Sequence, residues 1–317
     1  MVFTSTGNFH QHTISAINKS FIAMHKMWPI LTKAHIRTMN TRFKLFDSLT
    51  KSVLLYASPV WSMGKEDQIE RVQSLFIKKI LHLNPLTPGY LLRLETGRLP
   101  LGLNTLKNNI QFWIRCLNLD DSRITKQAFN ALLNMKSGNS EKNWCFQLRD
   151  QICSLGFPFV WEKQDPILIK KLLPQILESF INNSIQRDYT SIENSTRYAH
   201  YKLYKTNITP ERYLNNHNTP LYFVRIFSQL RLNLDIIRVK DKIIKLKSTE
   251  EPNCQLCNTP NDIRHILIDC STYTSLRSKL LRTLTPSNLH IFLNDDRNLY
   301  KLVYFISKTI AQTSVLN

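Results

Sequence analysis

Apolar side chains recur at intervals of three and four residues through the first quarter of the chain, with polar positions between them. This spacing places the apolar positions on one side of an α-helix. It predicts helices over residues 11–27, 36–57 and 66–83, with Pro29 interrupting the first. Amphipathic helices joined by short breaks can bury their apolar faces only against one another, so the pattern predicts a compact helical bundle over residues 1–83.

Helical periodicity returns after a connector rich in proline and glycine over residues 84–102. A segment rich in Asn, Thr and Tyr over residues 188–218 is expected to be looser. The further predicted helices cover residues 103–118, 123–135, 141–155, 166–187 and 220–247. The pattern therefore predicts a protein that is mostly α-helical.

Three cysteines and a histidine fall in one short window near the C-terminal end of the sequence. Their spacing is Cys254-x2-Cys257-x7-His265-x4-Cys270. Two thiolates separated by two residues can hold one metal ion from a tight turn, and a His and a Cys on a helix from about Asp262 complete a tetrahedron. The spacing predicts a closed, structural zinc site. The alternative is that these are three buried thiols and a core histidine.

This zinc site completes the expected architecture, in which helices are followed by a small C-terminal zinc-bound module. The predicted domains are a helical bundle over 1–83, a helical connector region over 84–247 and a C-terminal zinc-knuckle module over 248–317. The remaining cysteines are widely spaced on predicted helices, and we expect them to be small core residues. They are Cys116, Cys145 and Cys153.

The charge of the chain is strongly positive, with 42 Lys and Arg residues against 23 Asp and Glu residues and a net charge of +19. Residues 1–46 contain six basic residues and no acidic one, and residues 195–249 contain eleven basic residues against three acidic ones. Concentrated positive charge favours a nucleic-acid partner, because each cation placed on a phosphate releases counterions. The alternative is a set of solvated helix faces. We expect RNA, an RNA/DNA hybrid or target DNA as the partner.

Tyrosines alternate with cations over residues 197–205, and exposed aromatic rings beside cations can stack on bases. The alternative interpretation is that Tyr198, Tyr201 and Tyr204 form the buried stripe of a helix. The candidate nucleic-acid-binding residues are Lys19, Lys26, Lys33, Arg37, Arg42, Lys44, Lys78, Lys79, Arg197, Tyr201, Lys202, Lys205 and Arg231.

Composition and motif content argue against several other classes of protein. Seven glycines and the absence of a glycine-rich phosphate loop argue against a nucleotide-binding enzyme of that type. No apolar run approaches the ~18–20 residues that cross a bilayer. No strongly basic amphipathic segment has a clean apolar stripe with Trp anchors, so no membrane partner is expected. The N-terminal residues do not resemble a secretory signal, and six cysteines do not make a disulfide framework in a chain of 317 residues. These features favour a reducing compartment, nuclear or cytoplasmic.

Two Asp pairs are candidates for a polymerase-type metal site, Asp120-Asp121 and Asp295-Asp296. Such a site needs carboxylates that converge on ions ~3.5–4 Å apart. The first pair follows a predicted helix, and the second is expected to form an N-terminal helix cap. No catalytic residue is therefore predicted.

Several segments resemble, in the same order, the C-terminal part of non-LTR (LINE-type) retrotransposon reverse transcriptases. They are NFHQH (8–12), LLYASPVW (54–61), IERVQSLFIKKIL (69–81), TPGYLLRLETGRLPL (87–101), QLRLN (229–233) and the Cys/His cluster. The matches extend from residue 8 to about residue 280 and so cover most of the chain.

The resemblance implies that residues 1–83 correspond to the polymerase thumb, which grips the template–primer duplex. It also implies a zinc knuckle that handles RNA or target DNA during target-primed reverse transcription, and other retroelement proteins as further partners. The Tyr/Phe-x-Asp-Asp turn of the palm is absent from the sequence, so the resemblance implies an RNA-directed DNA polymerase fragment that is catalytically incomplete by itself. The x7 spacing before His265 differs from the x4 of the retroviral knuckle.

Two alternatives remain open. The chain could be a helical protein-interaction scaffold that zinc stabilises, without a nucleic-acid role. It could also be the tail of a longer enzyme, or one that acts in trans.

Overall fold

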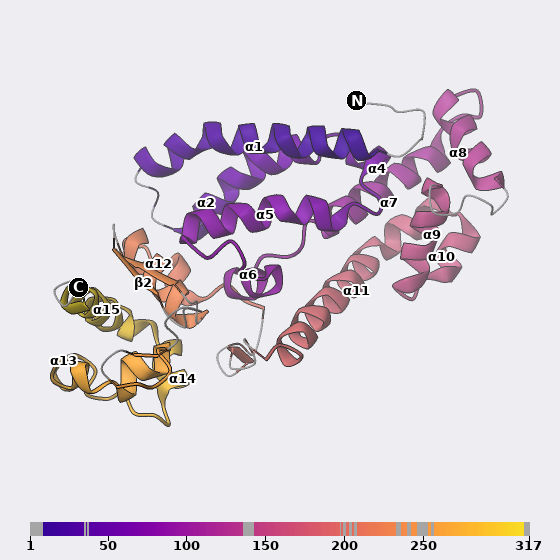
Figure 1. Cartoon of the computed structure of the whole chain (residues 1–317). Coiled ribbons are helices and arrows are strands. Elements are labelled where there is room, and N and C mark those ends of the chain that lie inside the picture. Colours follow the sequence, from indigo (N-terminus) through magenta and orange to yellow (C-terminus); the bar gives the residue numbers. More distant parts are fainter. Residues whose placement is uncertain are drawn as a thin grey trace. The chain divides into compact units, whose positions relative to one another are not determined.

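The computed structural model describes residues 9–34, 36, 38–135, 143–196, 198, 201–202, 205, 208–232, 236–239, 242–245, 253–254 and 257–313. Most of this described part is helical, which confirms the predicted fold class (Figure 1). Among the described helices, none combines the length and the hydropathy that crossing a bilayer requires.

The first two thirds of the described chain consist of helices and helical turns. They are α1 (His10–Lys33), α2 (Met39–Leu45), the π-helical turn η1 (Phe46–Lys51), α3 (Ser52–Leu54), α4 (Ser58–Trp61), α5 (Glu66–Leu81), α6 (Gly89–Thr96), α7 (Gly102–Asn118), α8 (Ile124–Asn134), α9 (Trp144–Ser154), α10 (Pro158–Lys163) and α11 (Pro166–Glu193). The later elements are shorter. They are η4 (Arg212–Asn215), α12 (Leu221–Arg231), β1 (Ile236–Val239), β2 (Lys242–Lys245), η5 (His265–Asp269), η6 (Ser271–Tyr273), α13 (Thr274–Leu280), α14 (Leu289–Asn294), η7 (Asp296–Asn298) and α15 (Leu299–Thr313).

The chain divides into two compact units that interleave along the sequence. The first contains the described residues of Met1–Ala34, Phe43–Gln73 and Leu99–Arg187. The second contains the described residues of His35–Arg42, Ser74–Arg98 and Asp188–Asn317. The boundaries of these units do not coincide with the domain boundaries expected at residues 83 and 247.

Helix α1 belongs to the first unit and continues through Pro29 to Lys33, so the expected interruption at the proline is wrong. Proline removes one backbone donor from a helix, which weakens it without always ending it. Met27 and Leu31, on either side of Pro29, are 1% and 2% exposed. Their packing holds the last turn in place, because tertiary burial outweighs the intrinsic cost of the proline.

The segment predicted as one helix over residues 36–57 contains a π-helical turn, η1. A wider turn changes which positions face the core, because each residue advances through a smaller angle. Thr50 and Leu54 are therefore buried, whereas Leu49 and Val53 are 40% and 38% exposed. An uninterrupted α-helix over residues 36–57 would instead place Leu49 and Val53 on the apolar face, with Phe46.

The core of the first unit is built around two tryptophans. The rings of Trp113 on α7 and Trp161 on α10 stack with centroids 4.9 Å apart. Cys116 and Cys145 are buried in the same cluster, as predicted. Cys153 is exposed, which corrects the expectation that it is a core residue.

The helix predicted over residues 220–247 ends at Arg231 in the structure. An antiparallel hairpin follows in the second unit, in which Ile236 pairs with Lys245 and Val239 pairs with Lys242. The reason lies in the local sequence, since isoleucine and valine fill three of the four positions of β1 and isoleucine fills two of the four of β2. These β-branched residues favour extended backbone.

Candidate metal centre and candidate phosphate contacts

The predicted metal ligands of the second unit converge. One ligand atom each from Cys254, Cys257, His265 and Cys270 lies within 4.8 Å of all the others. The sulfur atoms of Cys257 and Cys270 are 3.8 Å apart. Four groups at this separation could hold one metal ion between them.

A tight turn presents the first two cysteines on the same side. The amide of Asn258 donates to the carbonyl of Cys254 at 2.8 Å, and the amide of Cys254 donates to the carbonyl of Thr259 at 2.8 Å. Asn258 has a φ of 53°, in the left-handed region that Asn tolerates better than most residues. The chain therefore reverses directly after Cys257, and both thiols face the same point.

The histidine is held by a helical turn and by its own ring contact. The backbone amide of His265 donates to the side chain of Asp262 at 2.8 Å, which caps the turn. The Nδ1 atom lies 3.1 Å from the hydroxyl of Thr259. The Nε2 atom is buried and has no hydrogen-bond partner within the residues that the structure describes. An unpaired buried ring nitrogen is costly unless it binds a ligand, so Nε2 fits the role of a metal-binding atom.

The environments of the thiols differ. Hydrogen bonding from Ser271, whose hydroxyl lies 3.4 Å from the sulfur, lowers the pKa of Cys257. Burial raises the pKa of Cys270. Burial, together with the nearby cysteine sulfurs, also raises the pKa of Tyr273 to about 12. Of these two thiols, Cys257 therefore ionises more readily than Cys270.

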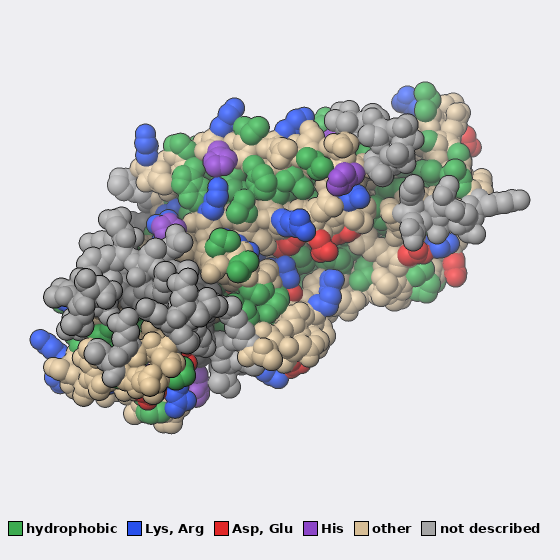
Figure 2. Space-filling view, in the orientation of Figure 1, with side chains coloured by type: hydrophobic (Ala, Val, Ile, Leu, Met, Phe, Trp, Pro, Cys, Tyr) green, Lys and Arg blue, Asp and Glu red, His purple; other side chains and the backbone are tan. Residues whose placement is uncertain are grey.

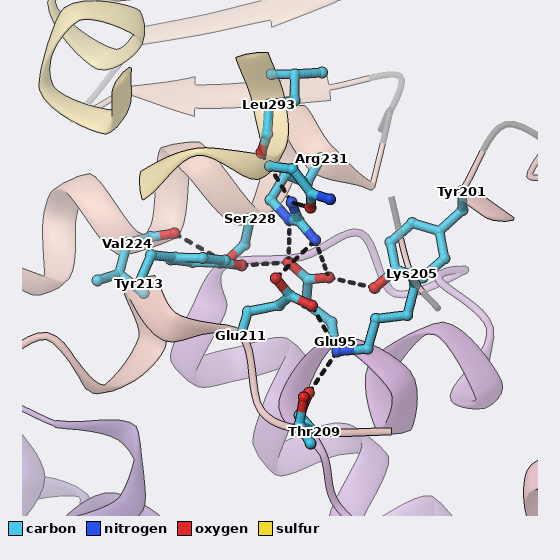
Figure 3. Close-up of polar contacts among 11 residues, drawn as sticks. Glu95, Tyr201, Lys205, Thr209, Glu211, Tyr213, Val224, Ser228, Arg231 and Leu293 are labelled. Atoms are coloured by element: carbon cyan, nitrogen blue, oxygen red, sulfur yellow. Dashed lines mark hydrogen bonds and ion pairs between the residues drawn. The ribbon is translucent and has the colours of Figure 1, made fainter. Parts of the chain in front are cut away.

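A second polar cluster lies in the core of the same unit, centred on the carboxylate of Glu95 (Figure 3). Nε of Arg231 donates to Oε1 of Glu95 at 2.8 Å, and the Tyr213 hydroxyl donates to the same oxygen at 2.6 Å. The Tyr201 hydroxyl donates to the other carboxylate oxygen. Arg231 also reaches Glu211 at 3.1 Å. We call this set of five side chains the buried Glu95 cluster.

Four of the described side chains expected to bind nucleic acid are buried, which corrects that expectation, and two of them belong to the buried Glu95 cluster. Arg231 and Tyr201 are fully buried. Lys205 is 2% exposed, and its ammonium group is 2.5 Å from Glu211. Arg42 is 4% exposed, donates to the carbonyl of Ile36, and has its pKa lowered by burial. These side chains offer no surface to a phosphate, because each is enclosed by protein.

Other candidate contacts do lie at the surface. Lys19, Lys26 and Lys33 on α1 and Lys44 on α2 are exposed. Lys202 is exposed and forms an ion pair with Glu193 at 2.6 Å. Arg37 and Arg197 lie outside the described residues, as does Tyr204.

The two lysines of α5 are half-buried. Lys78 donates to the carbonyl of Pro85 at 2.6 Å, and burial lowers its pKa. Lys79 is also half-buried, so both offer less surface than the lysines of α1.

In each Asp pair, the first carboxylate accepts a hydrogen bond from a backbone amide two residues later. The side chain of Asp295 caps η7 by accepting from the amide of Arg297, as predicted. The side chain of Asp120 accepts from the amide of Ser122 at 2.9 Å, directly after α7. Each of these carboxylates is therefore used within its own turn.

Sequence reasoning missed the roles of Glu95, Glu211 and Tyr213. A signal was present for Glu95 and Arg231, because each interrupts an otherwise apolar helical face. A charge in such a position is expected to be paired. No family model, curated protein or solved structure matches this chain, so any function must be argued from its own residues.

Proposed function

We propose that this chain binds RNA, an RNA/DNA hybrid or target DNA through exposed lysines, and that a structural zinc ion stabilises its C-terminal region. The resemblance to non-LTR retrotransposon reverse transcriptases supports this role. It is further supported by the buried Glu95 cluster, which joins Glu95 of the resembling segment 87–101 to Arg231 of the resembling segment 229–233. We assign no catalytic residue within the described part of the chain.

The observation that carries the proposal is the arrangement of lysines on α1. Lys19, Lys26 and Lys33 are seven residues apart, so they share one face of the helix at intervals of about 10.5 Å. All three are exposed, and no carboxylate of the described residues forms an ion pair with them. On the face drawn in Figure 2, Lys and Arg side chains stand along α1 and acidic ones lie elsewhere. Unpaired cations in a row attract phosphates because binding releases counterions.

Zinc is the metal that the donor set favours. Three thiolates and one imidazole are ligands of intermediate softness, which zinc prefers. Ligands at ~2.3 Å around a tetrahedral ion are separated by ~3.8 Å, which agrees with the distance between Cys257 and Cys270. A site with four protein ligands is closed, so the ion would hold two chain segments together and would not activate water.

Salt dependence tests the nucleic-acid role. We expect the wild-type chain to bind a fluorescent RNA/DNA hybrid with an affinity that falls steeply as salt rises, measured by anisotropy. Replacing Lys19, Lys26 and Lys33 by Ala removes three phosphate contacts and reduces the slope of log affinity against log salt by about 2–3.

A matched control replaces three exposed lysines elsewhere in the first unit, namely Lys163, Lys170 and Lys171. This control has the same change in net charge and keeps the wild-type slope. An affinity of the wild-type chain that does not change with salt contradicts the proposal.

A second candidate, the protein-interaction scaffold, is favoured by apolar side chains on the same helix. Ile22 and Ile30 are 56% and 46% exposed on α1. This candidate predicts that Ile22→Asn with Ile30→Asn abolishes binding of a protein partner, whereas the lysine variant does not. It also predicts no affinity for the hybrid at low salt.

A further inference from the structure

We propose that α12 and α15 present a stacking platform for the unpaired bases of single-stranded nucleic acid. The platform consists of the rings of Phe223, Tyr300 and Tyr304, with Lys301 and Lys308 beside them. This inference rests on the proposed function and names a separate site for one form of nucleic acid.

Two large aromatic side chains lie at the surface of α15, in the second unit. Tyr300 and Tyr304 are 45% and 51% exposed. They are four residues apart, so they are neighbours on one face of the helix. The opposite face is buried, with Leu302 and Phe305 0% exposed. The helix therefore makes its core contacts through its opposite face, and part of each tyrosine ring remains accessible at the surface.

The ring of Tyr300 is held in place from α12, which packs against α15 (Figure 1). The rings of Phe223 and Tyr300 have centroids 4.8 Å apart and planes tilted by 47°. The hydroxyl of Tyr300 donates to the carbonyl of Asn218 at 2.9 Å. A second link joins the hydroxyls of Tyr222 and Ser307 at 3.3 Å. An aromatic surface fixed in this way loses little conformational entropy on binding.

The charge around the rings is positive. The ammonium group of Lys308 lies 5.4 Å from the centroid of the Tyr304 ring. Lys301 is exposed on the same helix. The sequence contains no Asp or Glu from 297 to 317 or from 212 to 234, so neither helix of the platform carries a carboxylate. Asp295, which precedes α15, interacts electrostatically with Lys301 but is itself paired with the guanidinium of Arg297 at 2.7 Å. The exposed rings, with Lys301 and Lys308 beside them, match the bases and the phosphates of a single strand.

A duplex does not fit this surface, because its bases are already stacked on one another. Unpaired bases have free faces that can stack on tyrosine, and each stacked base strengthens binding about fivefold to a hundredfold. The platform should therefore discriminate between single strands and duplexes, which the lysines of α1 do not.

The test measures the affinity of the whole chain for a fluorescent oligothymidylate of about 15 nucleotides and for a duplex of the same length. Tyr300→Ala with Tyr304→Ala is expected to weaken single-strand binding about tenfold or more. Tyr300→Phe with Tyr304→Phe keeps both rings and is expected to stay within about twofold of wild type. Tyr56→Ala removes a tyrosine that is 79% exposed in the first unit and serves as the matched control.

The outcomes separate this inference from the proposed function. Loss of single-strand affinity in the double alanine variant, with duplex affinity retained, supports the platform. Wild-type affinity in that variant overturns the platform and leaves the lysines of α1 as the binding surface. Equal losses for single strand and duplex also overturn it, because stacking on unpaired bases cannot explain them. A wild-type chain that binds neither oligothymidylate nor hybrid overturns both proposals.

Discussion

Glu95 and Arg231 form a buried ion pair although 136 residues separate them in the sequence. Both side chains are 1% exposed. Burial alone would raise the pKa of Glu95, but the charge of Arg231 and hydrogen bonds from Arg231, Tyr201 and Tyr213 lower it. The Glu95 carboxylate is therefore charged at neutral pH in the folded protein. Its charge is compensated by Arg231 and by the two tyrosine hydroxyls.

Removing one partner of this pair should destabilise the fold severely. We expect Arg231→Met to lower the free energy of unfolding by about 3–5 kcal/mol, because it leaves a buried carboxylate without its cation. Urea denaturation at neutral pH measures the change. Arg297→Met, which breaks an exposed pair with Asp295, is the control and should leave the midpoint unchanged. Equal urea midpoints for the two variants would show that the buried pair contributes nothing to the stability of the fold.

The same pair predicts a dependence of stability on pH. A carboxyl group with a lowered pKa stabilises the folded state above its ordinary value of 4.5, and this contribution is lost as the pH falls below that value. Burial and the charge of Glu95 raise the pKa of Glu211, which acts in the opposite sense. The comparison of wild type with Glu95→Gln reports the net effect of the Glu95 charge, including its effect on the pKa of Glu211. Their difference in unfolding free energy should narrow as the pH falls from neutral to about 3. A constant difference over this range would contradict the lowered pKa.

Gly97 ends α6 in a left-handed conformation, with a φ of 65°. A Cβ atom there would lie 2.5 Å from the backbone nitrogen of Pro210. Gly64 has a φ of 68°, but a Cβ atom would meet only the side chain of Gln147 at 3.8 Å. We expect Gly64→Ala to cost about 1–2 kcal/mol from backbone strain, and Gly97→Ala to cost about 1–3 kcal/mol more. Thermal unfolding of both variants checks this order, and equal losses would refute the close contact with Pro210.

Metal content provides the direct test of the Cys/His cluster. We expect one zinc ion per chain by elemental analysis, and its loss in Cys257→Ser, because a serine hydroxyl is a much poorer zinc ligand than a thiolate. Cys153→Ser, at an exposed cysteine outside the cluster, should keep the full zinc content. A zinc content in Cys257→Ser equal to that of the control would exclude the site.

Local features of the structure followed from the sequence more closely than distant ones. Helix α5 begins at Glu66 as its periodicity predicts, because burial on one face leaves a repeating pattern in neighbouring residues. The metal ligands were predictable for a similar reason, since all four lie between Cys254 and Cys270. The π-helical turn at Phe46–Lys51 was not, because a single wide turn changes the phase without a strong local signal.

Whether an individual Lys or Arg side chain is exposed or buried was the least predictable feature. Lys33 and Arg231 carry the same charge, yet one is exposed and the other is fully buried. Arg231 can be buried because Glu95 compensates its charge, and the fold brings these two distant residues together. The apolar residues around Arg231 hinted at burial, but the sequence did not identify which carboxylate would compensate its charge.

The interleaving of the two units restricts how this protein can be divided. A single cut anywhere between Arg98 and Asp188 leaves Glu95 on one fragment and Arg231 on the other, and it also parts Arg93 from Asp188, whose side chains are 2.5 Å apart. No single continuous segment contains all of either unit without residues of the other, so neither unit can be moved into another protein by a simple gene fusion. The chain therefore has two cores, but neither is encoded by one continuous segment of the sequence.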